Sequence, residues 1–223
     1  MKREFLTTGD GSVTIHLPDW NEQYHSKHGA LNEALHVFIA MGFDFLKSQQ
    51  SLSEVNIMEI GFGTGLNAYL TLLRSREVKT SVNYVGVEGY PVALEEVEKL
   101  NYPESVGNDP EAFKKLHETA WEEASLVAKG FSLHKRKQFF SEIEDKEVYH
   151  LIYFDAFGAR VQPELWTEAI FQKMYNALLP NGVLVTYAAK GSVRRAMQAV
   201  GFTVERLPGP PGKREMLRAR KGE

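Results

Sequence analysis

Three features of the sequence could carry chemistry: a glycine-rich loop, carboxylates at the ends of apolar segments, and a basic C-terminal stretch. The loop, GFGTG at 61–65, follows the short apolar segment 55–60. Its glycines let the backbone turn tightly and approach a ligand closely. Glu59 precedes the loop, and Glu88 and Asp155 each follow another apolar segment. This pattern predicts a ligand site at the carboxyl edge of a parallel sheet, although a tight turn without a ligand would use the same glycines.

The spacing of the loop indicates which ligand would fit. The dinucleotide fingerprint is G-x-G-x-x-G, whereas this loop reads G-x-G-x-G and has Leu66 in the sixth place. Glu88 can accept hydrogen bonds from both ribose hydroxyls, or it is simply a turn carboxylate. We expect Glu59 to place a negative charge that repels a pyrophosphate and favours a cation. S-adenosylmethionine (SAM) carries a sulfonium and an ammonium but no phosphate, so the loop favours SAM over NAD.

Composition excludes several classes of protein. The 223 residues are 43% hydrophobic and 25% charged, which is typical of a globular domain. The absence of cysteine excludes a disulfide framework, a thiolate zinc site and a cysteine nucleophile. The seven histidines are scattered, so no metal site is expected. No apolar run has the length of a membrane span or the form of a signal peptide, and the expected location is the cytoplasm.

The net charge of −3 hides an asymmetry, because residues 190–223 carry +6 and residues 1–189 carry −9. A basic segment on an acidic body indicates a surface that faces anions, or else a solvated tail.

Alternating patterns predict the fold class. The Asp10-Gly11 turn predicts an N-terminal hairpin, and apolar spacing predicts an amphipathic helix over 30–47. Strands are expected at 55–60, 82–87, 131–136, 151–154, 182–187, 202–207 and 215–219. Helices are expected at 66–74, 91–130 and 163–178, and a last helix is expected between a Ser192 cap and Gly201. The last two strands are joined only by a loop, so they cannot be parallel neighbours.

The expected architecture is α/β: a doubly wound, mostly parallel seven-stranded sheet with a late antiparallel strand, preceded by the hairpin and helix. We expect an extension at 1–50 and a SAM-binding domain at 51–223, with a helical insertion at about 91–130, in one compact unit. This layout resembles the Rossmann-like fold of class I SAM-dependent methyltransferases.

Five blocks carry a more specific resemblance. They are EIGFGTGLN at 59–67, YHSKHGALNEALHVF at 24–38, DAFGARVQPELWTEAIF at 155–171, TYAAKGSVRRAMQAVGF at 186–202 and GPPGKREML at 209–217. In order and spacing they resemble the methyltransferase domain of the MnmC family of tRNA-modification enzymes and its stand-alone MnmD relatives. No FAD-dependent oxidase segment follows, so the stand-alone form is expected.

The resemblance implies an activity. This family uses SAM, with neither a metal nor FAD in this domain, to methylate the 5-aminomethyl group of the wobble uridine of tRNA, giving 5-methylaminomethyl-(2-thio)uridine. The implied partners are the tRNA anticodon region and a separate oxidase or upstream wobble-modification enzymes that supply the aminomethyl group.

The resemblance also implies roles for individual residues. The residues implied around SAM are Glu59, Gly61, Gly63, Gly65, Asn67 and Glu88, with Tyr24 and Glu33 near the cofactor and the target. Asp155 matches the acceptor-site aspartate, and Arg194, Arg195, Lys213 and Arg214 would face RNA. Two positions depart from the family pattern. Gln162-Pro163 replaces an Asn-Pro pair, and after the third strand only Gln138 could replace the acidic residue that contacts adenine.

The residues themselves support a mechanism. A primary alkylamine is largely protonated near pH 7 and must lose a proton before it attacks a methyl group. Asp155 can bind the ammonium, orient the amine and take or relay the proton, a role that typically contributes ~10²–10⁴-fold in rate. Phe157 would pack against the uracil or serve the core. Arg194 and Arg195 near a helix N-terminus are disfavoured by the helix dipole unless phosphates bind there.

Other functions use the same features. An aminopropyltransferase-like enzyme would take decarboxylated SAM and a polyamine, leaving the basic segment without a role. Another SAM-dependent methyltransferase of this fold would act on a different acceptor. A non-catalytic RNA-binding module would keep the basic surface but not bind SAM.

Overall fold

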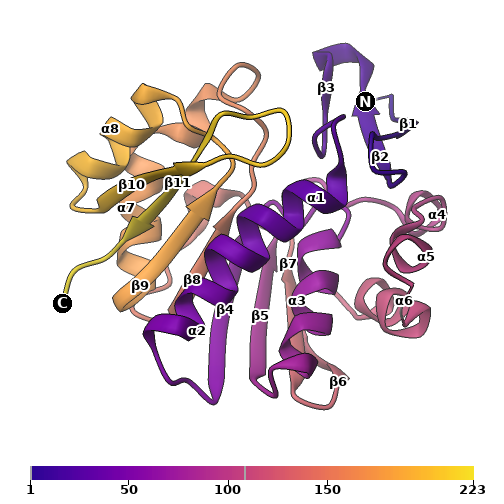
Figure 1. Cartoon of the computed structure of the whole chain (residues 1–223), viewed down its shortest axis with the longest axis horizontal. Coiled ribbons are helices and arrows are strands. Elements are labelled where there is room, and N and C mark those ends of the chain that lie inside the picture. Colours follow the sequence, from indigo (N-terminus) through magenta and orange to yellow (C-terminus); the bar gives the residue numbers. More distant parts are fainter. Residues whose placement is uncertain (1, 108) are drawn as a thin grey trace.

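A sheet of buried apolar strands forms the centre of the molecule (Figure 1). The computed structural model describes residues 2–107 and 109–223. Within them the main sheet has eight strands in the order β10-β11-β9-β8-β4-β5-β7-β6. These strands are β4 (Glu54–Ile60), β5 (Ser81–Val87), β6 (Ala124–Ala128), β7 (Phe131–Arg136), β8 (Tyr149–Phe154), β9 (Leu178–Thr186), β10 (Thr203–Pro208) and β11 (Glu215–Arg220).

The predicted fold class is confirmed, with one more strand than expected. Strands β7, β5, β4, β8 and β9 are parallel, and β11 pairs antiparallel with β9 and β10. The helix predicted to extend to residue 130 is wrong at its end, because residues 124–128 form β6, antiparallel to β7. Val127 is buried between exposed or half-buried neighbours and Gly130 makes a turn with φ +77°, a combination that favours a hairpin over a helix.

Helices cover both faces of the sheet. A long helix consists of α1 (Ala30–Ala34), a π-helical stretch (Leu35–Asp44) and α2 (Phe45–Gln49), and it crosses the front of the sheet in Figure 1. The hydrophobic core to which this long helix contributes also includes residues of α3 (Leu66–Glu77), α4 (Leu94–Val97), α5 (Tyr102–Val106) and α6 (Pro110–Glu118). The opposite core includes residues of α7 (Glu168–Ala177) and α8 (Gly191–Ala199). Alternation along β4 produces this division, since Ile57 enters one core and Met58 the other.

Two predicted helix ends differ in detail. The helix predicted over 163–178 divides into a 3₁₀ turn (Pro163–Trp166) and α7, with Thr167 extended between them. The predicted Ser192 cap is wrong. Helix α8 begins at Gly191, and the capping position belongs to Lys190, whose side chain makes no capping hydrogen bond.

The N-terminal strands form a separate small sheet that packs beside the main one. It consists of β1 (Glu4–Thr7), β2 (Val13–Leu17) and β3 (Glu22–Gln23), followed by residues that lead into α1. The Asn101 side chain accepts a hydrogen bond from the Val13 amide at 2.7 Å and donates one to the Gly11 carbonyl at 3.0 Å. The segment between β5 and β6 is thereby joined to the hairpin. The division into segments 1–50 and 51–223 stays a prediction.

The topology places the loops after β4 and β8 side by side, because these parallel strands are neighbours in the middle of the sheet. The carboxyl ends of parallel strands are where open α/β folds bind ligands. Among the described residues, no helix is both long and apolar enough to cross a membrane.

Candidate functional site

A cavity of about 1260 Å³ opens at this edge of the sheet. Several residues singled out in the sequence line it: Tyr24, Glu33, Gly61, Gly63, Glu88, Asp155, Phe157 and Lys213. Others lie outside its lining: Glu59, Gly65, Asn67, Arg194, Arg195 and Arg214. The structure therefore brings together carboxylates, the glycine loop and aromatic side chains from both halves of the chain.

The glycine loop lies directly against the residue that follows β8. Gly61 has φ +90°, and a Cβ atom there would come within 2.7 Å of the Asp155 carbonyl oxygen. The amides of Gly61 and Phe62 both donate to the Val87 carbonyl, at 3.0 and 3.1 Å. The loop is thus held between the ends of β5 and β8, with no room for a side chain at Gly61.

Asn67, in the first turn of α3, connects two carboxyl groups. Its Nδ2 donates to Glu59 Oε1 and to Asp155 Oδ2, both at 2.9 Å. The Tyr84 hydroxyl donates to the other Glu59 oxygen at 2.8 Å. Asn67 thereby fixes the orientation of the Asp155 side chain at the edge of the cavity.

Glu59 does not line the cavity, where the sequence led us to expect a negative charge that favours a cationic ligand. Its side chain is buried and outside the cavity lining. Burial, followed by the proximity of Asp155, raises the pKa of Glu59 well above its usual range, so the neutral carboxyl is favoured. Charge that could attract a cation comes instead from carboxylates that line the cavity.

Asp155 is poised to exchange a proton near neutral pH. Burial raises the pKa of Asp155 to about 7, and the neighbouring Glu33 carboxylate acts in the same direction. The hydrogen bond from Asn67 and the Lys213 ammonium oppose this rise. A carboxyl group whose pKa lies near 7 is suited to general acid–base work.

Glu88 is held by backbone amides at the end of β5. The Gly63 amide donates to Oε2 at 3.0 Å and the Tyr90 amide to Oε1 at 2.9 Å. Burial raises the pKa of this carboxyl, while the two amide hydrogen bonds act in the opposite direction. Each oxygen retains a lone pair, so the carboxylate can still accept hydrogen bonds from a ligand with two hydroxyls.

Lys213 was expected to face RNA, but its ammonium lies inside the cavity. It forms an ion pair with Glu33 and lies 3.8 Å from the centre of the Tyr187 ring. Arg195 and Arg214 are exposed and Arg194 is half-buried, all three outside the cavity.

Aromatic rings form one wall of the cavity. Phe157 makes edge contacts with Trp20 at 5.7 Å and with Tyr24 at 5.0 Å between ring centres. Near Glu88, the exposed rings of Tyr90 and Phe139 form another pair at 6.0 Å. The Gln138 side chain donates to the Glu142 carbonyl at 2.9 Å, and its backbone amide to the Glu88 carbonyl.

Sequence reasoning missed several lining residues. Arg3 donates to Glu96 at 2.5 Å, to the Tyr24 hydroxyl at 3.3 Å and to the Tyr90 carbonyl at 3.2 Å. No local pattern could have found Arg3, because its partners lie 21 to 93 residues away. Trp20 had a weak signal, as a large aromatic residue between a strand and a Gly-containing segment.

No group of three or more His, Asp or Glu side chains in the described part of the chain is arranged to hold a metal ion.

Comparison with known proteins finds relatives that match most of this chain. A family model described as S-adenosyl-L-methionine-dependent methyltransferase matches residues 136–222. The bifunctional protein MnmC of Cupriavidus metallidurans, named for tRNA 5-methylaminomethyl-2-thiouridine biosynthesis, is 26% identical over 97% of this chain and 34% of its own length. The MnmC protein of Aromatoleum aromaticum is 29% identical over 90% of this chain and 33% of its own. The predicted resemblance to the MnmC methyltransferase domain is confirmed. The chain spans about a third of the length of these MnmC relatives.

Solved structures agree on the fold. MnmC2 from Aquifex aeolicus superposes with a TM-score of 0.81 at 24% identity, covering 100% of this chain and 71% of that one. Spermidine synthase from Thermotoga maritima gives a TM-score of 0.59 at 15% identity, covering 100% and 72%. The prediction of SAM as the cofactor is confirmed by the family description.

The close approach of Gly61 to Asp155 can be tested with a matched pair of glycines. Gly107 also has positive φ, at +61°, but a Cβ atom there would meet nothing within 4 Å. We expect Gly61→Ala to lower the free energy of unfolding by about 1–3 kcal/mol more than Gly107→Ala, and to weaken SAM binding. Urea denaturation and calorimetry measure both effects. Equal effects of the two substitutions would show that the contact imposes no constraint.

The raised pKa of Asp155 predicts a pH-dependent stability. Its ordinary value is 3.8 and its folded value is about 7, so the folded state binds the proton more tightly. Stability from this group is therefore complete below about pH 4 and lost as pH rises through about 7. Asp155→Asn should therefore raise the free energy of unfolding relative to wild type. This gain should be about 1–3 kcal/mol larger at pH 8 than at pH 5.

Thermal or urea unfolding at the two pH values measures this difference. Asp19→Asn, on an exposed turn, is the control and should show no such increase. A stabilisation by Asp155→Asn that is the same at both pH values, or larger at pH 5, would contradict the assigned pKa.

Proposed function

We propose that this chain is a SAM-dependent N-methyltransferase that converts 5-aminomethyl-(2-thio)uridine at the tRNA wobble position to its 5-methylaminomethyl form. The observation that carries the proposal is the placement of Asp155. Its carboxyl group, with a pKa near 7, faces the same cavity as the glycine loop after β4. The likeness to MnmC proteins supports the choice of acceptor.

The cavity fits the cofactor on its own chemistry. Gly61 and Gly63 present bare backbone where a Cβ atom would be crowded by Asp155 or by the Tyr24 ring. Glu88 would accept hydrogen bonds from the ribose hydroxyls, and the Tyr90–Phe139 pair offers apolar surface for a flat base. Asn67 and Glu59 would act from behind the lining, by holding Asp155 in place. Gly65 opens α3 with φ +72°.

When bound, SAM supplies a methyl group already activated by its sulfonium. The protein's own task is to bind the acceptor ammonium, remove its proton and hold the amine in line. Asp155 would do this as a carboxylate: it would accept one proton from the ammonium and become a neutral carboxyl group. The freed lone pair of the amine would then form the N–C bond as the bond between the methyl carbon and sulfur breaks, with the neutral thioether as the leaving group. A pKa near 7 makes Asp155 a stronger base than an ordinary aspartate.

The acceptor base would lie against the aromatic wall. Phe157 follows Asp155 by two residues and lines the cavity with Trp20 and Tyr24. Their edge contacts fix the Phe157 ring, so that it can pack against a uracil beside the carboxylate.

Exposed cations support a tRNA partner. Arg195 and Arg214 are exposed in the C-terminal segment, which carries +6, and Arg194 is half-buried in α8. Such cations bind backbone phosphates, and the resulting affinity falls with salt. The proposal extends to the anticodon region of tRNA, to a cytoplasmic location, and to a separate oxidase or upstream enzyme that supplies the aminomethyl group.

An aminopropyltransferase is the second candidate, favoured by the likeness in fold to spermidine synthase. It would take decarboxylated SAM and a polyamine. The exposed arginines would then have no ligand, and product analysis with putrescine separates the two candidates.

The methyl-transfer proposal predicts labelling of the wobble base. With labelled SAM and aminomethyl-bearing tRNA, the wild-type chain should transfer label to wobble uridine. Asp155→Ala should lower kcat by ~10²–10⁴-fold, because the amine then loses its proton acceptor. Nucleoside analysis of the tRNA identifies the labelled product.

Asp19→Asn should retain full activity as the control. The substrate assignment fails if SAM binds but no label reaches the tRNA. The catalytic assignment fails if Asp155→Ala works at the wild-type rate.

A further inference from the structure

The loop between β10 and β11 sends a lysine ammonium into the cavity. Lys213 forms an ion pair with Glu33, whose side chain is only 7% exposed. Its Nζ lies 3.8 Å from the centre of the Tyr187 ring. Lys213, Glu33, Tyr187 and Asp155 all line the same cavity. An ammonium group therefore already lies among the groups that would receive the acceptor amine.

The surroundings of this ammonium form a built site for a cation. The other Glu33 oxygen accepts a hydrogen bond from the Ser26 amide at 3.1 Å, which fixes the carboxylate. The Tyr187 hydroxyl donates to the carbonyl of Ala156, the residue that follows Asp155, at 2.8 Å. This hydrogen bond fixes the position of the Tyr187 ring. A carboxylate combined with an aromatic face is a strong arrangement for binding an ammonium.

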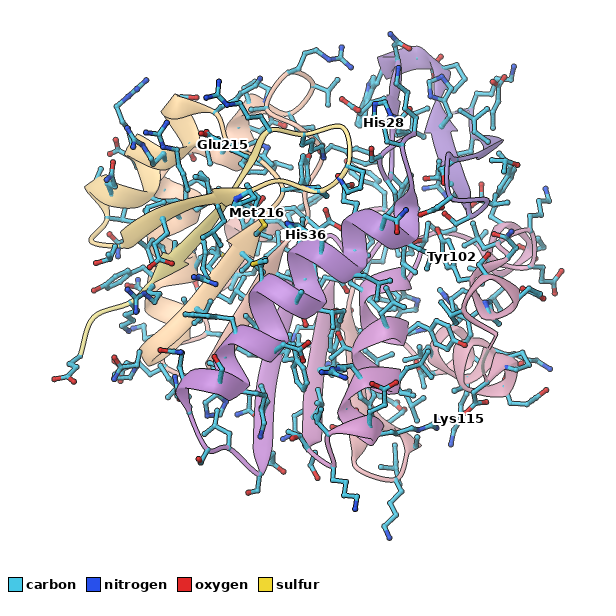
Figure 2. All side chains as sticks on the ribbon, in the orientation of Figure 1. His28, His36, Tyr102, Lys115, Glu215 and Met216 are labelled. Carbon is cyan, nitrogen blue, oxygen red and sulfur yellow. The ribbon has the colours of Figure 1, made fainter. Side chains whose placement is uncertain are left out.

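The loop itself is anchored, whereas the lysine side chain is flexible. His36 Nε2 donates to the Pro208 carbonyl at 2.8 Å, and the Gly209 amide donates to the Arg214 carbonyl at 3.1 Å. His28 packs against Gly212 so closely that a Cβ atom there would lie 2.3 Å from the ring. Figure 2 shows His28 and His36 in the N-terminal part of the chain, near the C-terminal ribbon. The four-carbon stem of Lys213 can withdraw while the backbone stays in place.

We propose that Glu33, Tyr187 and Asp155 form a subsite for a primary alkylammonium and that Lys213 occupies it until an acceptor displaces it. Lysine and a 5-aminomethyl group both end in CH₂–NH₃⁺, so the internal group is a chemical stand-in for the substrate. The inference rests on the proposed function only in taking the acceptor to be a primary amine. Glu33 and Tyr187 are then recognition residues, and Lys213 is a competitor.

Binding of a nucleoside pair tests the subsite. The probes are 5-aminomethyluridine and its uncharged analogue 5-hydroxymethyluridine, titrated by NMR into the full chain with S-adenosylhomocysteine present. Lys213→Gln should tighten binding of the amine about tenfold, because the competing internal ammonium is gone. Lys213→Arg keeps a cation and should bind no more tightly than wild type. Binding of the hydroxymethyl analogue should be the same in all three proteins.

Two further variants complete the design. Glu33→Gln removes the charge without changing the size of the side chain and should weaken amine binding at least about tenfold. Lys146→Gln, an exposed lysine outside the cavity lining, is the matched control and should leave binding unchanged. Thermal melting shows that each variant is folded.

The subsite is overturned if Lys213→Gln binds the amine no more tightly than wild type does, or binds neither nucleoside at millimolar concentration. It is also overturned if the substitution raises the affinity for both nucleosides by the same factor. If the subsite test fails in one of these ways but the wild-type chain still transfers methyl groups to tRNA, the proposed function stands and only the subsite is rejected. If the binding results are as expected but no methyl transfer to tRNA is seen, the ammonium subsite is supported and tRNA is rejected as the acceptor.

Discussion

The close approach of the loop after β4 to the residue after β8 is the constraint on which the site depends. The Asp155 amide donates to the Ile60 carbonyl at 2.9 Å, and Gly61 leaves no room for a side chain beside the Asp155 carbonyl. Asn67 then binds the Asp155 carboxyl group from the first turn of α3. A parallel pair of central strands thus fixes a glycine loop and an acidic side chain on the same side of one cavity.

The remaining walls come from segments that the parallel sheet does not supply. The N-terminal hairpin and the residues on either side of it contribute Arg3, Trp20 and Tyr24, and the long helix contributes Glu33. Hydrogen bonds between Asn101 and the hairpin, and the ion pair of Arg3 with Glu96, join these walls to the segment after β5. The general fold provides the cofactor edge, while these added segments shape the place for an acceptor.

Local patterns were sufficient to predict most of the fold and the cofactor edge. Apolar runs that end in glycine or an acidic residue identified β4, β5 and β8, and with them the glycine loop, Glu88 and Asp155. The β6 strand was missed because its short sequence also fits a helix, and the Gly130 turn with pairing to β7 selects the strand. The raised pKa of Glu59 was missed because it depends on burial and on the proximity of Asp155, which lies 96 positions further along the chain.

Long-range contacts could not be predicted in the same way. Lys213 and Glu33 are 180 residues apart, and each had a plausible separate role: one facing RNA, the other near the cofactor. The fold brings both to one cavity, where a charge expected at the surface becomes part of the site. A basic residue in a glycine- and proline-rich loop therefore indicates its partner only once the topology of the last strands is known.

A crystal structure of the protein with S-adenosylhomocysteine bound tests the central claim most directly. We predict that the ribose hydroxyls lie within hydrogen-bond distance of Glu88, and that the sulfur faces the part of the cavity lined by Asp155, with Gly61 and Gly63 against the ligand. A ligand bound away from the β4 loop, or a carboxyl group of Asp155 turned out of the cavity, would contradict the account.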